Sequence, residues 1–122
     1  MKIFRHSLTV TANSKDEFFN ITAEVQECIR RNSVCDGIVV VTACDCGSAL
    51  FLGRWNNELR EDFLELLSDI VNDRIIRKYP QEQACAYLKS ILTGNTVSAA
   101  ITDGRIELGA EQQLIYADFD AG

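Results

Sequence analysis

The side chains best suited to chemistry in this sequence are five cysteines and a single histidine. Cys44 and Cys46 flank one aspartate, and Cys85 follows much later in the chain. Thiolates bind zinc and softer metals, but structural zinc takes four ligands, usually at wider spacings than Cys-x-Cys. We therefore expect no metal or other cofactor, with a zinc site on Cys44, Cys46 and Cys85 as the alternative. Free cysteines most often pack as small apolar residues.

Residues for acid–base catalysis near neutral pH are few. His6 is the only imidazole, and one histidine cannot build a metal site or a nucleophile–base pair without distant partners. It lies in an alternating segment, where a packed or rim position is the usual role. No glycine-rich phosphate loop of the Walker or dinucleotide type is present. The carboxylates around Asp62 follow a helical pattern that is typical of a solvated face.

Composition limits the classes of partner. The net charge is −6 and the isoelectric point is near 4.7, so no basic patch is available for a nucleic-acid backbone. The longest apolar run, 38–41, is too short to span a membrane, and the first ten residues lack the apolar stretch of a signal peptide. We expect a cytoplasmic protein with its cysteines as thiols, folded as one domain over residues 1–122.

The first half of the chain predicts strands around one helix. Alternation over 2–11 predicts a strand, and Thr22 is expected to cap a helix that ends near Arg31. The β-branched run 37–43 predicts a strand buried on both faces, and 48–52 a short strand that ends at Gly53.

The second half predicts two helices followed by strands. Asn56 or Asn57 should cap the first helix, and Gly94 should close the second, which begins near residue 81. The residues expected to face inward are Leu59, Phe63, Leu66, Leu67 and Ile70 on the first helix, and Ala84, Leu88, Ile91 and Leu92 on the second. Asp103-Gly104 predicts a hairpin between 96–101 and 105–108, and 112–119 is the last strand. The order β-α-β-β-α-α-β-β-β indicates the α+β class.

Several motifs, taken in order, resemble the YjbQ-like family. They are Phe19-Asn-Ile-Thr22, Glu24-Val-Gln-Glu27, Asp36-Gly37, Lys89-Ser-Ile-Leu-Thr-Gly94, Ile101-Thr-Asp-Gly-Arg105, Leu108-Gly109 and Tyr116-Ala-Asp-Phe-Asp120. No single motif is highly specific, but their order and spacing cover nearly the whole chain. The resemblance implies a two-sheet β-sandwich with flanking helices that assembles as a homotrimer. Family members have been labelled secondary thiamine-phosphate synthases, although their reaction is poorly defined.

The same resemblance implies a histidine-lined site near a subunit boundary, built from two motifs. Cys46 falls where the first motif has its histidine, and Tyr87 falls where the second has one. Gln83 replaces the asparagine of the second motif. Gln112 is the surviving residue of a Thr-Trp-Gln motif, and Asp62 matches an aspartate near the family's pocket. Catalysis of the family type would therefore use four positions: Cys46, Asp62, Tyr87 and Gln112.

The resemblance also gives candidates for ligand binding and one difference in length. The residues expected to contact a ligand are Gln83 and four others that match motif positions: Ser48, Asn57, Glu58 and Arg105. The family's basic final strand is absent, which predicts that 112–119 is an edge strand, relieved by acidic residues or paired across a subunit boundary.

Three hypotheses of function follow from these observations. The leading one is a divergent, non-catalytic YjbQ-like protein, a trimeric scaffold whose remnant cleft binds a small metabolite. One alternative is a family-type, thiamine-phosphate synthase-like enzyme acting on a small phosphorylated or pyrimidine-like metabolite. The other is the cysteine-based metal or redox module. The small number of titratable groups at the motif positions favours the first.

Overall fold

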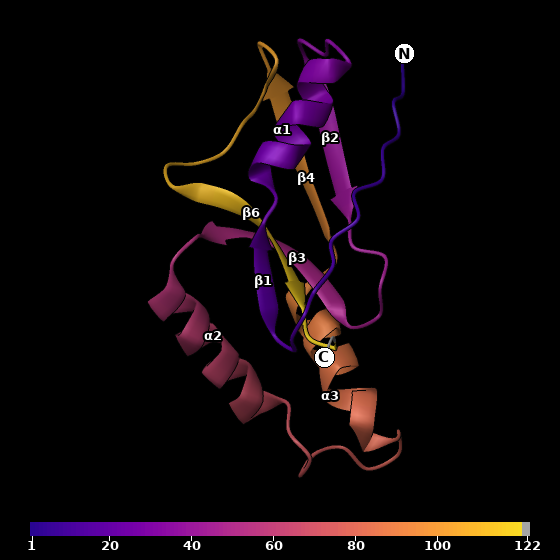
Figure 1. Ribbon diagram of the computed structural model, residues 1–122, viewed down its shortest axis with the longest axis vertical. Coiled ribbons are helices and arrows are strands. Elements are labelled where there is room, and N and C mark those ends of the chain that lie inside the picture. The colour runs from indigo at the N-terminus through magenta and orange to yellow at the C-terminus, as the bar shows by residue number, and fades with distance from the viewer. Residues whose placement is uncertain (121–122) are drawn as a thin grey trace.

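Nine elements in the predicted α+β order make up the computed structural model, which describes residues 1–120 and the side chains of all of these except 81 and 82. They are β1 (Glu17–Asn20), α1 (Thr22–Arg31), β2 (Gly37–Thr42), β3 (Ser48–Arg54), α2 (Asn57–Ile70), α3 (Gln81–Thr93), β4 (Thr96–Thr102), β5 (Arg105–Ile106) and β6 (Gln112–Asp118). They form two antiparallel sheets, in the strand orders β1-β6-β3 and β2-β4-β5 (Figure 1).

Strand β6 is central in its sheet, so the prediction that 112–119 forms an edge is wrong. It pairs with β3 from Ser48↔Asp118 to Arg54↔Gln112, and with β1 on its other side. The second neighbour of β6 is β1, a strand of four residues. Its sequence, Glu-Phe-Phe-Asn, has no distinct alternating pattern that would have predicted it. Strand β3 also continues through Gly53 to Arg54, two residues beyond the predicted strand 48–52.

The strand predicted over 2–11 is absent. Residues 1–9 are exposed, and Val10 is the first residue that packs against the core. The alternating pattern is real, but a strand also needs a neighbouring strand that supplies backbone hydrogen bonds and cross-strand contacts. Here β1 occupies the edge of the sheet beside β6, and the N-terminal segment runs past it (Figure 1).

The second sheet is buried on one face only, which corrects the prediction for 37–43. Val39 and Val41 pack against the core with α1, whereas Ile38 and Val40 are 75% and 62% exposed. Strand β2 is an edge strand and nothing in the described chain covers its outer face. The hairpin prediction is confirmed, because Asp103 and Gly104 both have positive φ between β4 and β5.

The helix caps follow the prediction at α2 and differ at α1. Asn56 caps α2 by accepting a hydrogen bond from the Leu59 backbone N–H at 2.9 Å. At α1, Thr22 is already the first helical residue, and its backbone N–H donates to the Asn20 side chain. The Thr22 hydroxyl instead accepts from the Leu114 backbone N–H at 2.8 Å, which fastens the helix to β6.

Helix α3 turns its small residues toward β3 and its large apolar residues outward, so the prediction is confirmed for Ala84, which is buried, and is wrong for the larger residues. Ala86 and Ser90 are buried, whereas Leu88, Ile91 and Leu92 are exposed. The Ser90 hydroxyl donates to the Ser48 carbonyl, and so close an approach of a helix to a strand leaves room only for small side chains.

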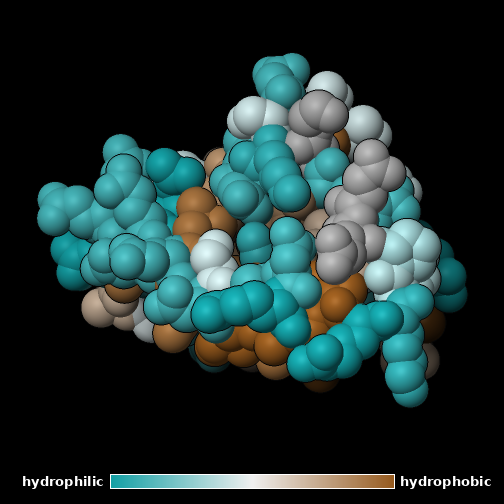
Figure 2. Space-filling model, turned by 90° about the horizontal axis from the view of Figure 1, so that it is seen from below, coloured by the Kyte–Doolittle hydropathy of each residue, from teal (hydrophilic) through white to brown (hydrophobic). Residues whose placement is uncertain are grey.

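Helix α2 also differs from the prediction. Leu67 is buried and Phe63 is half-buried, but Leu59, Leu66 and Ile70 are about half exposed. Apolar side chains consequently reach the surface among hydrophilic ones at the lower end of the molecule (Figure 2). No helix within residues 1–120 has the length and apolar content needed to cross a membrane.

The close contact at the start of β3 gives a stability prediction. A Cβ atom added to Gly47 would lie 2.6 Å from Asp120 Cβ, so we expect Gly47→Ala to lower the free energy of unfolding by about 1–3 kcal/mol. Chemical denaturation measures this change. Gly37→Ala is the control, because its Cβ would meet its nearest atom at an ordinary 3.5 Å. Equal midpoints for the two variants would contradict the packing argument.

Candidate functional site

Two of the predicted site residues, Cys46 and Tyr87, meet where α3 crosses the beginning of β3. The turn before β3 is fixed by the Gly47 carbonyl, which accepts from the Phe119 backbone N–H at 2.9 Å. Gly47 is buried because Ala86 of α3 and Asp120 lie directly over it. Cys46 itself is exposed, and Tyr87 is half-buried beside it.

The Tyr87 phenol is held in its neutral form. Its ring packs edge-on against Tyr79, with ring centroids 5.9 Å apart. Burial raises the pKa of Tyr87, and the negative charges of Asp120, ionised Tyr79 and ionised Cys46 raise it further. A phenol whose pKa exceeds its usual value of about 10 is a poor base near neutral pH. Tyr87 therefore does not replace the imidazole that the family resemblance places at this position.

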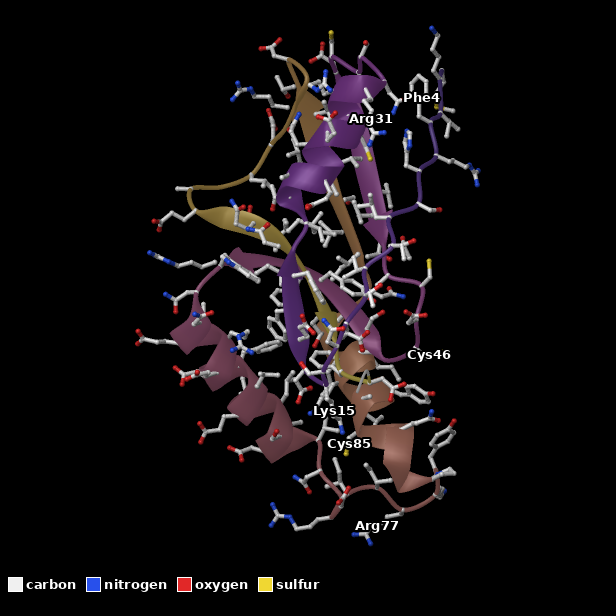
Figure 3. All side chains as sticks on the ribbon, viewed as in Figure 1. Phe4, Lys15, Arg31, Cys46, Arg77 and Cys85 are labelled. Atoms are coloured by element: carbon white, nitrogen blue, oxygen red, sulfur yellow. The ribbon has the colours of Figure 1, made fainter. Side chains whose placement is uncertain are left out.

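The three candidate thiol ligands are not brought together. Cys44 is exposed and its Sγ lies 3.9 Å from the Thr42 carbonyl, and Cys46 is exposed on the same turn. Cys85 Sγ lies 3.8 Å from Asp73 Oδ1, in the segment between α2 and α3 (Figure 3). Among the side chains that the structure describes, no three His, Cys, Asp or Glu residues converge in a way that could hold a metal ion.

The other motif positions are spread over the molecule. Gln112 lies at the opposite end of β6 from the Cys46 turn, since it pairs with Arg54 while Asp118 pairs with Ser48. Six residues of strand separate the two ends by about 20 Å. The Gln112 side chain accepts from the Gly109 backbone N–H and so closes a turn.

The candidates for ligand contact are also separate from one another. Asp62 and Glu58 are exposed on α2, and Gln83 is exposed on α3. Arg105 belongs to the other sheet. Ser48 is fully buried and donates its hydroxyl to the Asp45 carbonyl, so its role is structural.

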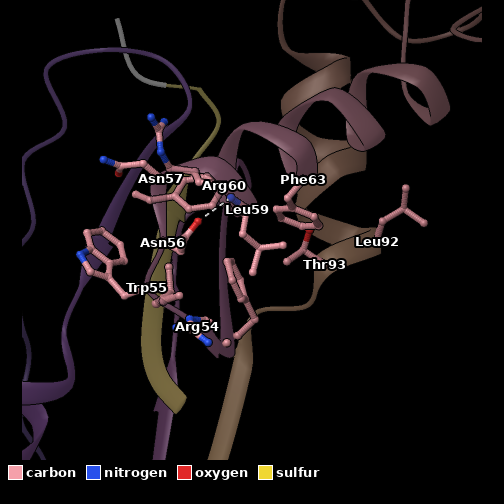
Figure 4. Close-up of a pocket in the computed structure, with 13 residues that line it drawn as sticks. Arg54, Trp55, Asn56, Asn57, Leu59, Arg60, Phe63, Leu92 and Thr93 are labelled. Carbon is pink, nitrogen blue, oxygen red and sulfur yellow. Dashed lines mark hydrogen bonds between the residues drawn. The ribbon is translucent and has the colours of Figure 1, made fainter. Parts of the chain in front are cut away.

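A cleft of about 420 Å³ opens between the N-terminal end of α2 and the sheet β1-β6-β3 (Figure 4). Its walls are mainly apolar and aromatic. The lining residues are Phe18, Phe51, Gly53, Arg54, Trp55, Asn56, Asn57, Leu59, Arg60, Phe63, Leu92, Thr93 and Ile115. Of the predicted site residues, only Asn57 belongs to this set. The remaining residues come from five elements and one loop, and no local motif connects them.

Phenylalanine rings give the cleft its shape. Phe63 of α2 lies 5.5 Å from the Phe51 ring and 6.2 Å from the Phe18 ring, measured between centroids. These rings hold α2 against the sheet at its middle. Nearer the beginning of α2, Leu59 is half exposed and Trp55 is 46% exposed, so the space beside them stays open.

A few polar groups border the cleft. The Arg54 guanidinium forms an ion pair with Glu111 at 2.7 Å. The Arg60 guanidinium lies over the Phe18 ring, 5.9 Å from its centroid. The Thr93 hydroxyl oxygen is buried on the inner wall without a hydrogen-bond partner in the described part of the chain. The lining residues named above include no cysteine, histidine or carboxylate, and the apolar walls with a few polar groups are typical of a small-molecule site.

Comparison with known proteins gives a consistent family assignment. Residues 6–122 match the family model described as UPF0047 protein YjbQ-like. A UPF0047 protein from Archaeoglobus fulgidus is 29% identical over 93% of this chain and 89% of its own length. Another, from Methanocaldococcus jannaschii, is 24% identical over 91% of this chain and 81% of its own length.

Solved structures share the fold. The crystal structure of an uncharacterised YjbQ/UPF0047 family protein from Clostridium acetobutylicum superimposes with a TM-score of 0.85 at 22% identity, covering 92% of this chain and 88% of that one. A protein from Aeropyrum pernix described as hypothetical gives 0.84 at 20% identity, covering 92% and 85%. The predicted family and two-sheet α+β fold are therefore confirmed.

The tyrosine environments predict a pH dependence. Burial raises the pKa of Tyr116 as well as that of Tyr87, so the folded chain holds both phenol protons more tightly than the unfolded chain. This contribution to stability is complete below about pH 10 and is lost as the pH rises through the folded-state pKa values. Tyrosinate absorbance should appear at higher pH in native than in urea-unfolded protein. Tyr87→Phe should remove part of the absorbance that appears at high pH in the native protein. Superimposable titration curves for native and unfolded protein would refute the prediction.

Proposed function

This chain belongs to the YjbQ-like UPF0047 family, and from that premise we propose that it is a non-catalytic member, a homotrimer that binds a small metabolite. The observation that carries the proposal is the separation of two sites. The motif positions hold Cys46 and a neutral Tyr87 where the family resemblance places imidazoles. The cleft beside α2 has the volume and apolar lining of a ligand site but no group for catalysis.

The outward apolar residues of α3 support self-assembly. Leu88, Ile91 and Leu92 are 37%, 76% and 58% exposed on one helix, while its small residues face β3. Apolar side chains gathered on a surface favour association with another protein. Ile38 and Val40 on the outer face of β2 are a second uncovered set. Closed cyclic assembly by repetition of one interface would cover such surfaces in every subunit.

We predict that Ile91→Glu converts the trimer to monomers without unfolding them. The side chain is 76% exposed within the subunit, so the charge costs little there but would be desolvated in an interface. Light scattering at micromolar concentration gives the mass, and circular dichroism confirms folding. Gln83→Glu adds the same charge at an exposed polar position of α3 and serves as the control. A wild-type monomer would end the proposal of a trimer.

The alternative function is a family-type enzyme acting on a small phosphorylated or pyrimidine-like metabolite. It would need Cys46, Tyr87, Asp62 and Gln112 in one site. Because Gln112 and Cys46 lie at opposite ends of the strand pair β3–β6, that site would have to combine residues of two subunits. A Cys46 thiolate would further need a base or cation beside it, and Tyr87 is neither.

We expect no thiamine-phosphate synthase-type turnover and less than one metal ion per chain in the purified protein. Positioned proton transfer is worth about 10²–10⁴-fold in rate, and the motif positions lack the imidazoles that would provide it. Activity assays and elemental analysis measure both quantities. Restoring histidine with Cys46→His and Tyr87→His together should raise metal uptake. One zinc per chain that is lost in Cys46→Ser would instead establish the cysteine-based metal module.

The cysteines and the net charge bear on the cellular compartment and on the classes of partner. Five free cysteines, two of them intermediate in exposure and three exposed, suit a reducing compartment such as the cytoplasm. The charge of −6 favours no nucleic-acid partner. Both features agree with a scaffold whose partners are copies of itself and a small ligand.

A further inference from the structure

We propose that the cleft beside α2 is specific for a small amphipathic anion, a carboxylate carried on an aromatic or alicyclic ring. The inference rests on the proposed function, because it specifies the ligand of the same cleft. Its support comes from three features of the lining: the aromatic walls, the Arg60 guanidinium and the Thr93 hydroxyl.

The aromatic walls favour a ring-shaped body. Phe18, Phe51 and Phe63 pack with interplanar angles between 58° and 72°, so their rings present both edges and faces around the opening. Trp55 closes the side opposite α3 (Figure 4). A planar ligand ring can make edge-to-face and offset contacts with such walls, which strengthens binding beyond burial of apolar area alone.

The charge of the ligand follows from Arg60. Among the carboxylates whose side chains the structure describes, none lies within ion-pair distance of Arg60, whereas Arg54 in the same lining is already paired with Glu111. Arg60 is half-buried against Phe18, so its charge is less screened by water than that of a surface arginine. In a chain of net charge −6, this cation beside an apolar cavity complements an anionic ligand.

Helix α2 strengthens the same preference. Its N-terminus borders the cleft, and the Asn56 side chain occupies only the Leu59 backbone N–H. The free N–H groups of the first turn and the helix dipole attract negative charge. A carboxylate near Arg60 would therefore meet the guanidinium charge and a helix terminus whose positive potential the Glu58 carboxylate of the first turn partly offsets.

Thr93 indicates a polar atom at the inner end of the ligand. Its hydroxyl oxygen is buried and lacks a hydrogen-bond partner, and Figure 4 shows it directed toward Phe63 at the inner wall. A buried polar group without a partner is costly, and native structures usually satisfy such groups with protein, water or ligand. Because this oxygen has almost no accessible surface, a hydroxyl or carbonyl oxygen on the ligand ring would supply that partner only once the Phe63 ring moves aside.

The test uses two dyes that share one ring system. Anilinonaphthalene sulfonate is an anion, and phenylnaphthylamine is its neutral counterpart without the sulfonate. Trp55 is the only tryptophan in the chain and lines the cleft, so energy transfer from it to a bound dye reports occupancy of this site. We expect one dye per chain, with the anion bound about tenfold more tightly, a ratio that one charge-assisted hydrogen bond can supply.

Variants of Arg60 test whether its guanidinium causes the tighter binding of the anionic dye. Arg60→Gln should abolish the difference between the dyes and leave binding of the neutral dye unchanged, while Arg60→Lys should keep part of it. Arg77→Gln removes the same charge at an exposed position outside the lining and should change nothing. Unchanged near-ultraviolet circular dichroism shows that each variant has folded.

Other outcomes would refute either the preference for an anion or the binding function itself. Equal affinity for both dyes, or an unchanged preference in Arg60→Gln, would refute the anion inference while the proposed binding function stands. Failure of both dyes to accept energy from Trp55 would refute the binding function too. Binding only after Ile91→Glu has dissociated the assembly would show that a second copy of the chain covers the cleft, which would refute both.

Discussion

The close approach of α3 to the beginning of β3 is the constraint on which the rest of the molecule depends. Gly47, Ala86 and Ser90 leave no room for larger side chains, and the Ser90 hydroxyl bonds directly to the Ser48 carbonyl. Because this face of α3 is filled by small residues, its leucines and isoleucine must point away from the sheet. One packing contact therefore determines both the position of the Cys46 turn and the apolar surface of the subunit.

Helix α2 is attached in a different way. It contacts the sheet through bulky rings, with Phe63 against Phe18 and Phe51, and through Leu67 in the second core cluster. Large side chains in the middle hold the helix farther from the sheet than α3 lies from β3 (Figure 1). The beginning of α2 has no equivalent ring to fill the gap, and the cleft results. The candidate site thus lies where packing is incomplete, as is common for small-molecule sites.

The two sites show which features of the fold are independent of the side chains at the motif positions. The Cys46 turn and Tyr87 keep their places because backbone hydrogen bonds and small residues hold them, not because imidazoles are present. Side chains at such positions change without cost to the core, since Cys46 is exposed. Function is located in side chains on a fold, and the fold alone does not preserve it.

The sequence by itself determined the features that depend on local chemistry. Every element after the first strand was predicted in its order, whereas β1 at Glu17–Asn20 was not predicted. The Asp103-Gly104 hairpin and the Asn56 cap were also predicted, because turn and cap geometries are set by the residues that form them. The family and fold class followed from motifs in their order along the chain. The identities of Cys46 and Tyr87 at the two motif positions were equally visible, since they require only reading the residue there.

Tertiary structure alone decided which partner each pattern received. The alternation over 2–11 did not produce a strand because β1 already pairs with β6, and the face of α3 was chosen by the space beside β3. Helical periodicity defines a stripe of residues but does not say what that stripe will contact. The cleft could not be predicted from the sequence for the same reason. Phe18, Trp55, Arg60 and Thr93 are scattered along the sequence, and only the folded chain brings them together.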